Sequence, residues 1–277
     1  MKTARLSCVL ALVASCTGES GAPHLARGNV LVNNGKREEA AAEYAKAAQL
    51  MPKSSLARER LGDVLSDLGR LDEAVAAYRD AVRVDGSAVT ARIGAATALA
   101  NKGDAAAARK ELDAAHEAAP TNLFVLVSRG NLAARAGDKK AALADYQRAV
   151  HLKSDNVAAL YAYGLALLDD GQVPEASSTF DRIVKLAPDS PTGWFGRART
   201  AASQGQAALA GAALAEAAKR VAADARRGLA EQGLAGEALQ ARAAEAVKRS
   251  LASMQADPAF ARFAGDPAFR AASEPAR

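Results

Sequence analysis

The chain has 277 residues, of which half are apolar but only 4% are aromatic, and its formal net charge is +5. Alanine and leucine supply most of the apolar residues and suit closely packed helices, whereas strand-forming residues never alternate in runs, which argues against a β-sheet protein. Lysine and arginine are scattered along the chain, which argues against the concentrated basic face that nucleic-acid binding requires.

Residues 1–15 have the pattern of a secretory signal. Lys2 and Arg5 precede an apolar stretch from Leu6 to Ala14, which is well short of the ~20 residues that a membrane-spanning helix needs. The segment therefore predicts export and not a membrane anchor. Its removal takes two basic residues with it and leaves 34 basic against 31 acidic residues, a net charge of +3.

The four residues Val13-Ala14-Ser15-Cys16 resemble the lipobox of bacterial lipoproteins, in which an aliphatic residue and two small residues precede a cysteine. The resemblance implies cleavage before Cys16, acylation of its sulfur and a lipidated tether over residues 16–23. Thr17 stands where an aspartate commonly retains such proteins in the inner membrane, which favours the outer membrane of the bacterial envelope, facing the periplasm. Ordinary cleavage nearby, which releases a soluble secreted protein, is the alternative.

A period of 34 residues follows the signal. Six glycines recur at this spacing, and an alanine follows each of them five residues later. The glycines are Gly35, Gly69, Gly103, Gly137, Gly171 and Gly205, and the alanines are Ala40, Ala74, Ala108, Ala142, Ala176 and Ala210. A small residue lies seven positions before each glycine, and a large ring or a leucine lies four positions after each alanine. Glycine is typical of helix ends, where it adopts a left-handed conformation easily, so each of these glycines is expected to end a helix.

This pattern resembles the tetratricopeptide repeat, a pair of antiparallel helices. The resemblance implies an all-α fold, a right-handed superhelical solenoid of about six helix pairs over residues 21–222, in which the first helix of each pair lines a concave groove. The units lie near 21–54, 55–88, 89–122, 123–156, 157–190 and 191–222. The last unit lacks a closing proline, so its second helix is expected to run on.

Residues 223–277 predict a C-terminal helical cap. Gly228, Gly233 and Gly236 are expected to divide it into two or more helices. Asp257-Pro258-Ala259-Phe260 and Asp266-Pro267-Ala268-Phe269 are near copies, and each predicts a helix start, because aspartate caps a helix and proline suits its first turn. Phe260, Phe263 and Phe269 are expected to pack back on the last helices of the array and shield them; a separate docking element is the alternative.

The register of the repeat gives candidate partner-binding residues on the first helices. The candidates are Asn29, Asn33, Glu59, Asp63, Asp67, Asn101, Phe124, Asn131, Arg135, Tyr161, Phe195 and Arg199. Asparagine pairs with both polar groups of a peptide backbone, and aromatic and arginine side chains anchor interfaces. We therefore expect an extended or helical partner segment in the groove, with its basic part near Glu59, Asp63 and Asp67. Taken singly, each side chain is more simply a solvated or stacking position.

No catalytic, metal or cofactor site is expected. His24, His116 and His151 fall in different repeats without acidic or cysteine partners at ligand spacing, and no phosphate-binding loop or nucleophile motif occurs. Cys8 lies in the signal and Cys16 is the acylation site, so no disulfide is expected either.

The function that follows is a non-catalytic scaffold. It is expected to bind one or more envelope proteins through the groove, to touch the membrane only through its lipid, and to help assemble an outer-membrane or periplasmic complex. A pilotin-like secretin assembly factor is the closest analogy. The alternative is an accessory protein that binds or exports an envelope polysaccharide, with Tyr161 and Phe195 against sugar faces. The sequence leaves the oligomeric state open.

Overall fold

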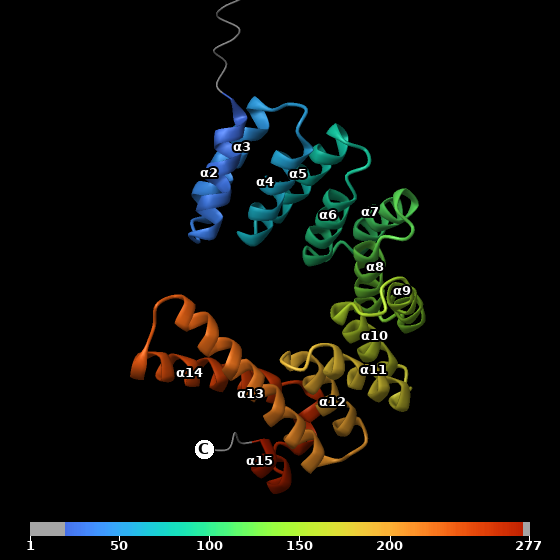
Figure 1. Ribbon diagram of the computed structural model, residues 1–277. Helices are drawn as coiled ribbons and strands as arrows, with labels where there is room; N and C mark the ends of the chain where they lie inside the picture. The colour runs from blue at the N-terminus through green and yellow to red at the C-terminus, as the bar shows by residue number, and fades with distance from the viewer. Residues whose placement is uncertain (1–19, 274–277) are drawn as a thin grey trace, which may run out of the picture. The chain divides into compact units, whose positions relative to one another are not determined.

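The computed structural model describes residues 20–273, which are helical throughout apart from short connections (Figure 1). No strand occurs within this range. The all-α prediction is confirmed. The signal and the lipidation site Cys16 lie outside the described residues.

The helices of the array form consecutive pairs, each made of a 13-residue helix and, up to α11, a 14-residue helix. The pairs are α2 (Gly21–Asn33) with α3 (Arg37–Leu50), α4 (Ser55–Asp67) with α5 (Leu71–Val84), α6 (Val89–Asn101) with α7 (Ala105–Ala118), α8 (Leu123–Arg135) with α9 (Lys139–Leu152), α10 (Val157–Asp169) with α11 (Val173–Leu186), and α12 (Pro191–Ser203) with α13 (Ala207–Glu231). Since α2 already begins at Gly21, residues 21–23 are helical, and the expected tether over residues 16–23 overlaps the first helix.

The six periodic glycines end the first helix of each pair. Their φ angles lie between +74° and +89°, a region that costs side-chain-bearing residues roughly 1–2 kcal/mol. At the first turn, Gly35 N–H donates to Val32 O and Lys36 N–H donates to Leu31 O, both at 2.9 Å, so the last carbonyls of the helix are satisfied. The predicted role of these glycines is confirmed.

The ring on each second helix fills the space between two first helices. A Cβ atom built on Gly62 would lie 2.7 Å from the ring of Tyr78, and one built on Gly94 in the next pair would lie 2.5 Å from the same ring. Phe180 lies in the same way between two glycines of neighbouring pairs. Small residues on the first helices are therefore required for consecutive pairs to stack.

The chain forms two compact units, and their boundary falls inside α8. The first unit extends to Leu132, and its core consists mainly of alanine, leucine and tyrosine side chains of α2 to α8. The second unit begins at Ala133, and its core combines leucines and Phe180 with a separate cluster of phenylalanines at the C-terminal end.

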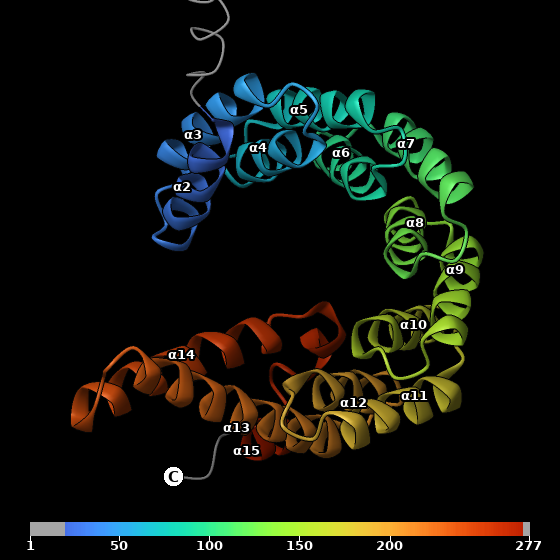
Figure 2. The same cartoon turned by 45° about the horizontal axis from the view of Figure 1, so that its top comes forward.

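The C-terminal part of the second unit extends beyond the last helix pair. Helix α13 continues past residue 222 to Glu231, and α14 (Gly236–Gln255) runs back along it (Figure 2). A 3₁₀ helix, η1 (Pro258–Phe263), and α15 (Pro267–Ser273) follow. Phe260, Phe263 and Phe269 pack together against α12 and α13.

One expected helix break is wrong. Gly228 lies inside α13, and the helix ends instead at Gly233, where φ is +84°. An interior glycine costs only about 1 kcal/mol relative to alanine, so it does not stop a helix that otherwise continues. None of the helices between residues 20 and 273 combines the length and the apolar character needed to cross a membrane.

Candidate functional site

A pocket of about 900 Å³ opens in the second unit between α10, α12 and the end of α14. Its apolar wall comes from Val157, Tyr161, Phe195 and Met254, and its polar groups come from Thr192, Ser250, Ser253 and Asp257. Helices α10 and α12 are first helices of their pairs, the ones on which the sequence places the binding face. A volume of this size matches the cavities in which proteins hold ligands or partner side chains.

The pocket is lined by two of the predicted partner-binding residues, and a third lies beside it. Tyr161 and Phe195 line it, and Arg199 lies one helical turn beyond Phe195 on α12. Each ring also contacts a buried phenylalanine: Tyr161 lies 5.9 Å from Phe180, and Phe195 lies 6.0 Å from Phe260, both in tilted arrangements. Burial raises the pKa of Tyr161, so its hydroxyl stays neutral.

The wall formed by α14 and Asp257 was not predicted as part of a binding site. Residues 223–277 were expected to form a cap but have no repeat register, because the 34-residue period stops before this segment. Ser250, Ser253 and Met254 lie on one face of α14, three and four residues apart, as helical geometry requires of side chains that line one surface. Only the folding back of α14 places this face opposite α10 and α12.

Two of the predicted residues in the first unit bond within their own helix pair. The hydroxyl of Tyr44 donates to Asn29 Oδ1 at 2.7 Å, and that of Tyr78 donates to Asp63 Oδ1 at 2.8 Å. In both pairs the acceptor lies 15 residues before the tyrosine. The same spacing from Phe180, which has no hydroxyl, leads to the apolar Leu165. In these three pairs the residue at this register position matches the chemistry of the ring beneath it.

The acidic face of α4 is partly neutralised. Asp63 lies 3.4 Å from Arg60 Nη1, and Asp67 lies 3.2 Å from Arg37 Nε on the preceding helix pair. Burial raises the pKa of the half-buried Glu59, and the neighbouring carboxylate of Asp63 adds to this shift. These contacts leave less net negative charge for a basic partner segment than the sequence suggested.

The remaining candidates lie outside the pocket. They are Asn33, Asn101, Phe124, Asn131 and Arg135, and all are exposed. Phe124 stands out because 71% of it is exposed, on the first turn of α8, where Asn122 caps the helix by accepting from the N–H groups of Phe124 and Val125.

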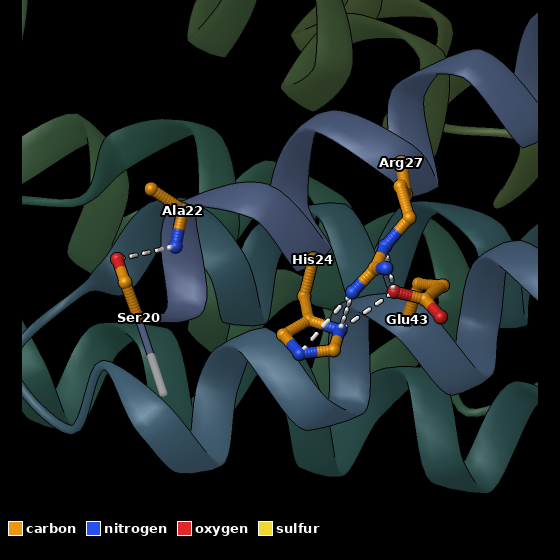
Figure 3. A network of polar contacts seen from close by, with 5 residues as sticks. All are labelled: Ser20, Ala22, His24, Arg27 and Glu43. Carbon is orange, nitrogen blue, oxygen red and sulfur yellow. Dashed lines mark hydrogen bonds and ion pairs between the residues drawn. The ribbon is translucent and has the colours of Figure 1, made fainter. Parts of the chain in front are cut away.

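His24 has an acidic partner that does not lie at metal-ligand spacing in the sequence (Figure 3). It is buried, and its Nδ1 lies 2.7 Å from Glu43 Oε2 on α3, while Arg27 Nε donates to the same oxygen at 3.1 Å. The hydrogen bond with His24, followed by the charge of Arg27, lowers the pKa of Glu43. The sequence missed this contact because the two residues are 19 apart and meet only when α2 packs on α3.

This network joins two helices and does not form a metal site. Within residues 20–273 no group of three histidine, cysteine, aspartate or glutamate side chains is placed to hold a metal ion. Ser20 completes the N-terminal end of α2, where its Oγ accepts from the N–H of Ala22 at 3.4 Å (Figure 3).

The fold and the pocket define a helical-repeat protein in which two first helices, α10 and α12, and the C-terminal helix α14 line an open, ligand-sized pocket. Family comparison identifies the repeat: the tetratricopeptide repeat model matches residues 25–83, 59–122 and 127–191. The chain belongs to the tetratricopeptide repeat family, whose members generally mediate protein–protein interactions. A search of curated protein sequences finds no significant match.

Solved structures agree with this assignment. PilF of Pseudomonas aeruginosa is 16% identical with a TM-score of 0.59, and the match covers 70% of this chain and 88% of that chain. The structure of Cut9 with Hcn1, from the APC/C, has 17% sequence identity and a TM-score of 0.62, and the match covers 79% of this chain and 44% of that chain. The thermophilic tetratricopeptide repeat protein TTC0263 of Thermus thermophilus has 20% sequence identity and a TM-score of 0.54, and the match covers 67% of this chain and 99% of that chain. At these identities the similarity establishes the fold.

Proposed function

We propose that the chain is a non-catalytic scaffold that holds a segment of a partner protein in the pocket between α10, α12 and α14. The observation that carries this proposal is the pocket itself, on the first helices of a repeat family that binds proteins. Aromatic and methionine side chains supply adaptable apolar contacts. The serine and threonine hydroxyls on its two sides offer hydrogen bonds to a peptide backbone.

The proposal also includes the cellular location of the protein and the kind of complex that it helps to assemble. The lipobox-like residues before Cys16 support a lipid anchor in the bacterial envelope, with the outer membrane as destination and the array in the periplasm. A scaffold anchored in this way would help assemble or organise an outer-membrane or periplasmic complex, for which a pilotin-like role is the closest analogy. A partner protein, and no nucleic acid, is the proposed ligand.

Cross-linking from the pocket wall tests the partner site. Ala158 is exposed and lines the pocket, so a photo-cross-linking residue at this position in living cells should give a defined protein adduct, identified by mass spectrometry. Ser253→Arg fills the pocket and should abolish the adduct. Ala252→Arg changes an exposed neighbour on α14 that does not line the pocket and should leave the adduct intact. No adduct, or one insensitive to Ser253→Arg, would contradict the proposal.

A further inference from the structure

The C-terminal segment Asp257–Phe260 lies on the same surface of α12 as the pocket. Asp257 lines the pocket, and its Oδ2 accepts from Arg199 Nη1 at 3.3 Å, with only 17% and 25% of the two side chains exposed. Phe260 is 1% exposed and its ring packs on Phe195. The chain's own carboxylate and ring thus contact Arg199 and Phe195, two of the predicted partner-binding residues of this face.

The register explains why Arg199 is available for this contact. It lies 15 residues before Leu214, at the position where Asn29 and Asp63 receive a tyrosine hydroxyl in the earlier pairs. Leucine offers no hydrogen bond, and the guanidinium of Arg199 instead reaches Tyr161 on α10 and Asp257. Its Nε is buried and has no hydrogen-bond partner among the described residues, which leaves donor capacity for a further acceptor.

The two Asp-Pro-Ala-Phe copies differ in whether the aspartate forms an ion pair. Asp266 caps α15 by accepting from the N–H groups of Ala268 and Phe269, and no ion pair to it is formed within the described residues. Asp257 caps η1 by accepting from Ala259 N–H at 2.9 Å and, in addition, pairs with Arg199. Capping therefore explains the second aspartate fully but leaves the Arg199 contact of the first unexplained.

We propose that residues 257–260 are an internal competitor that occupies the site of a partner segment carrying a carboxylate and, three residues later, an aromatic side chain. This inference rests on the proposed function, because it names the chemistry of the partner. The partner's carboxylate replaces Asp257 on Arg199, its ring replaces Phe260 on Phe195, and its flanking apolar residues enter the adjoining pocket. The competitor lowers the apparent affinity in proportion to the time it occupies the site.

A labelled synthetic peptide with the sequence of residues 256–265 serves as the probe, and fluorescence anisotropy with the full-length protein in detergent measures its binding. Asp257→Asn removes the charge but keeps a good cap, since asparagine caps as well as aspartate. It should tighten peptide binding about fivefold, the effect expected from losing an ion pair of this kind. Asp266→Asn is the matched control and should leave the affinity of the wild type unchanged.

Two further measurements make the result decisive. With the wild type and with Asp257→Asn, a peptide with asparagine in place of its aspartate should bind about fivefold more weakly than the parent peptide, and Arg199→Gln should bind the two peptides equally. Amide hydrogen exchange should rise in η1 of Asp257→Asn while α12 and α13 stay protected, which shows displacement of the segment and not unfolding. Equal or weaker peptide binding by Asp257→Asn, or a preference of Arg199→Gln for the peptide that carries the aspartate, would overturn the proposal.

The two proposals fail in different ways. If the probe binds no variant while the Ala158 adduct still depends on Ser253, the partner site stands and the acidic–aromatic chemistry is wrong. If Asp257→Asn gains probe affinity but Ser253→Arg leaves the cellular adduct intact, the surface recognises this chemistry and the pocket is not the partner site.

Discussion

Single residues of the repeat decide which side chains of the first helices remain available to a partner. Where the second helix carries a tyrosine, its hydroxyl bonds Asn29 or Asp63. Where it carries leucine, as at Leu214, the corresponding Arg199 turns to another acceptor. In these three pairs the availability of the first-helix side chain to a partner therefore depends on the residue beneath it as well as on its own polarity.

Tyr78→Phe tests this relation. The hydroxyl of Tyr78 donates to a carboxylate, whereas that of Tyr44 donates to a neutral amide oxygen. Hydrogen bonds to charged groups contribute about 1.5–3 kcal/mol and those to neutral groups about 0.5–1.5 kcal/mol. Tyr78→Phe should therefore lower the free energy of unfolding more than Tyr44→Phe in urea titrations. Equal losses, or the reverse order, would contradict the assigned bonds.

Glycines that look alike in the sequence have opposite effects on stability. A Cβ at Gly196 would lie 2.1 Å from the fully buried ring of Phe180, so Gly196→Ala should destabilise the protein by roughly 1–3 kcal/mol through overpacking. Gly228 lies in α13 with open space around it. Gly228→Ala should stabilise the folded protein by up to about 1 kcal/mol, because alanine has a higher helix propensity than glycine. Thermal unfolding of both variants gives the comparison, and a stable Gly196→Ala protein would show that the ring can move.

At the scale of elements, the first helix pair depends on contacts between α2 and α3 and has no preceding pair among the described residues. His24 and Arg27 on α2 both contact Glu43 on α3. These contacts favour the ionised carboxylate and lower its pKa. A group with a lowered native pKa stabilises the fold above its ordinary pKa, and this stabilisation is lost as the pH falls through the native value.

Glu43→Gln should therefore flatten the acid dependence of stability in α2 and α3. In the wild type, protection of α2 amides from hydrogen exchange should fall as the pH drops below the ordinary glutamate pKa of 4.5, and this fall should be smaller in the variant. Glu38→Gln, which removes a carboxylate from the same helix, is the control and should keep the wild-type slope. If amide protection of α2 falls with pH equally steeply in the wild type and in Glu43→Gln, the contacts of Glu43 with His24 and Arg27 are not the cause of the acid dependence.

At the scale of the whole molecule, the proposed function depends on the lipoprotein-like N-terminal signal as well as on the helical repeats. Cys16→Ala should release the protein from the membrane fraction and abolish incorporation of labelled fatty acid, because the tether then lacks its acyl chains. Cys8→Ala, which changes the only other cysteine, should leave both properties as in the wild type. A membrane-bound, unlabelled Cys16→Ala protein would show that another feature provides attachment.

The array itself was predictable from the sequence because each helix pair repeats the same local requirements. Gly35 and its five counterparts end first helices, and Tyr78 and its counterparts need small residues on both sides; these conditions act within one pair or between neighbours. The predicted Tyr161 and Phe195 lie in the pocket for the same reason, since register alone fixes which helix face they occupy.

The completed pocket was decided only by tertiary structure. Residues 223–277 carry no repeat, so nothing in their spacing indicates that α14 turns back along α13 and places Ser253 and Met254 opposite α10. The Asp257–Arg199 pair joins residues 58 apart, and the His24–Glu43 contact depends on the packing of two helices. The sequence by itself determined the repeated helix pairs, where each constraint is local; contacts between non-repeated segments depend on long-range packing, which period and composition do not encode.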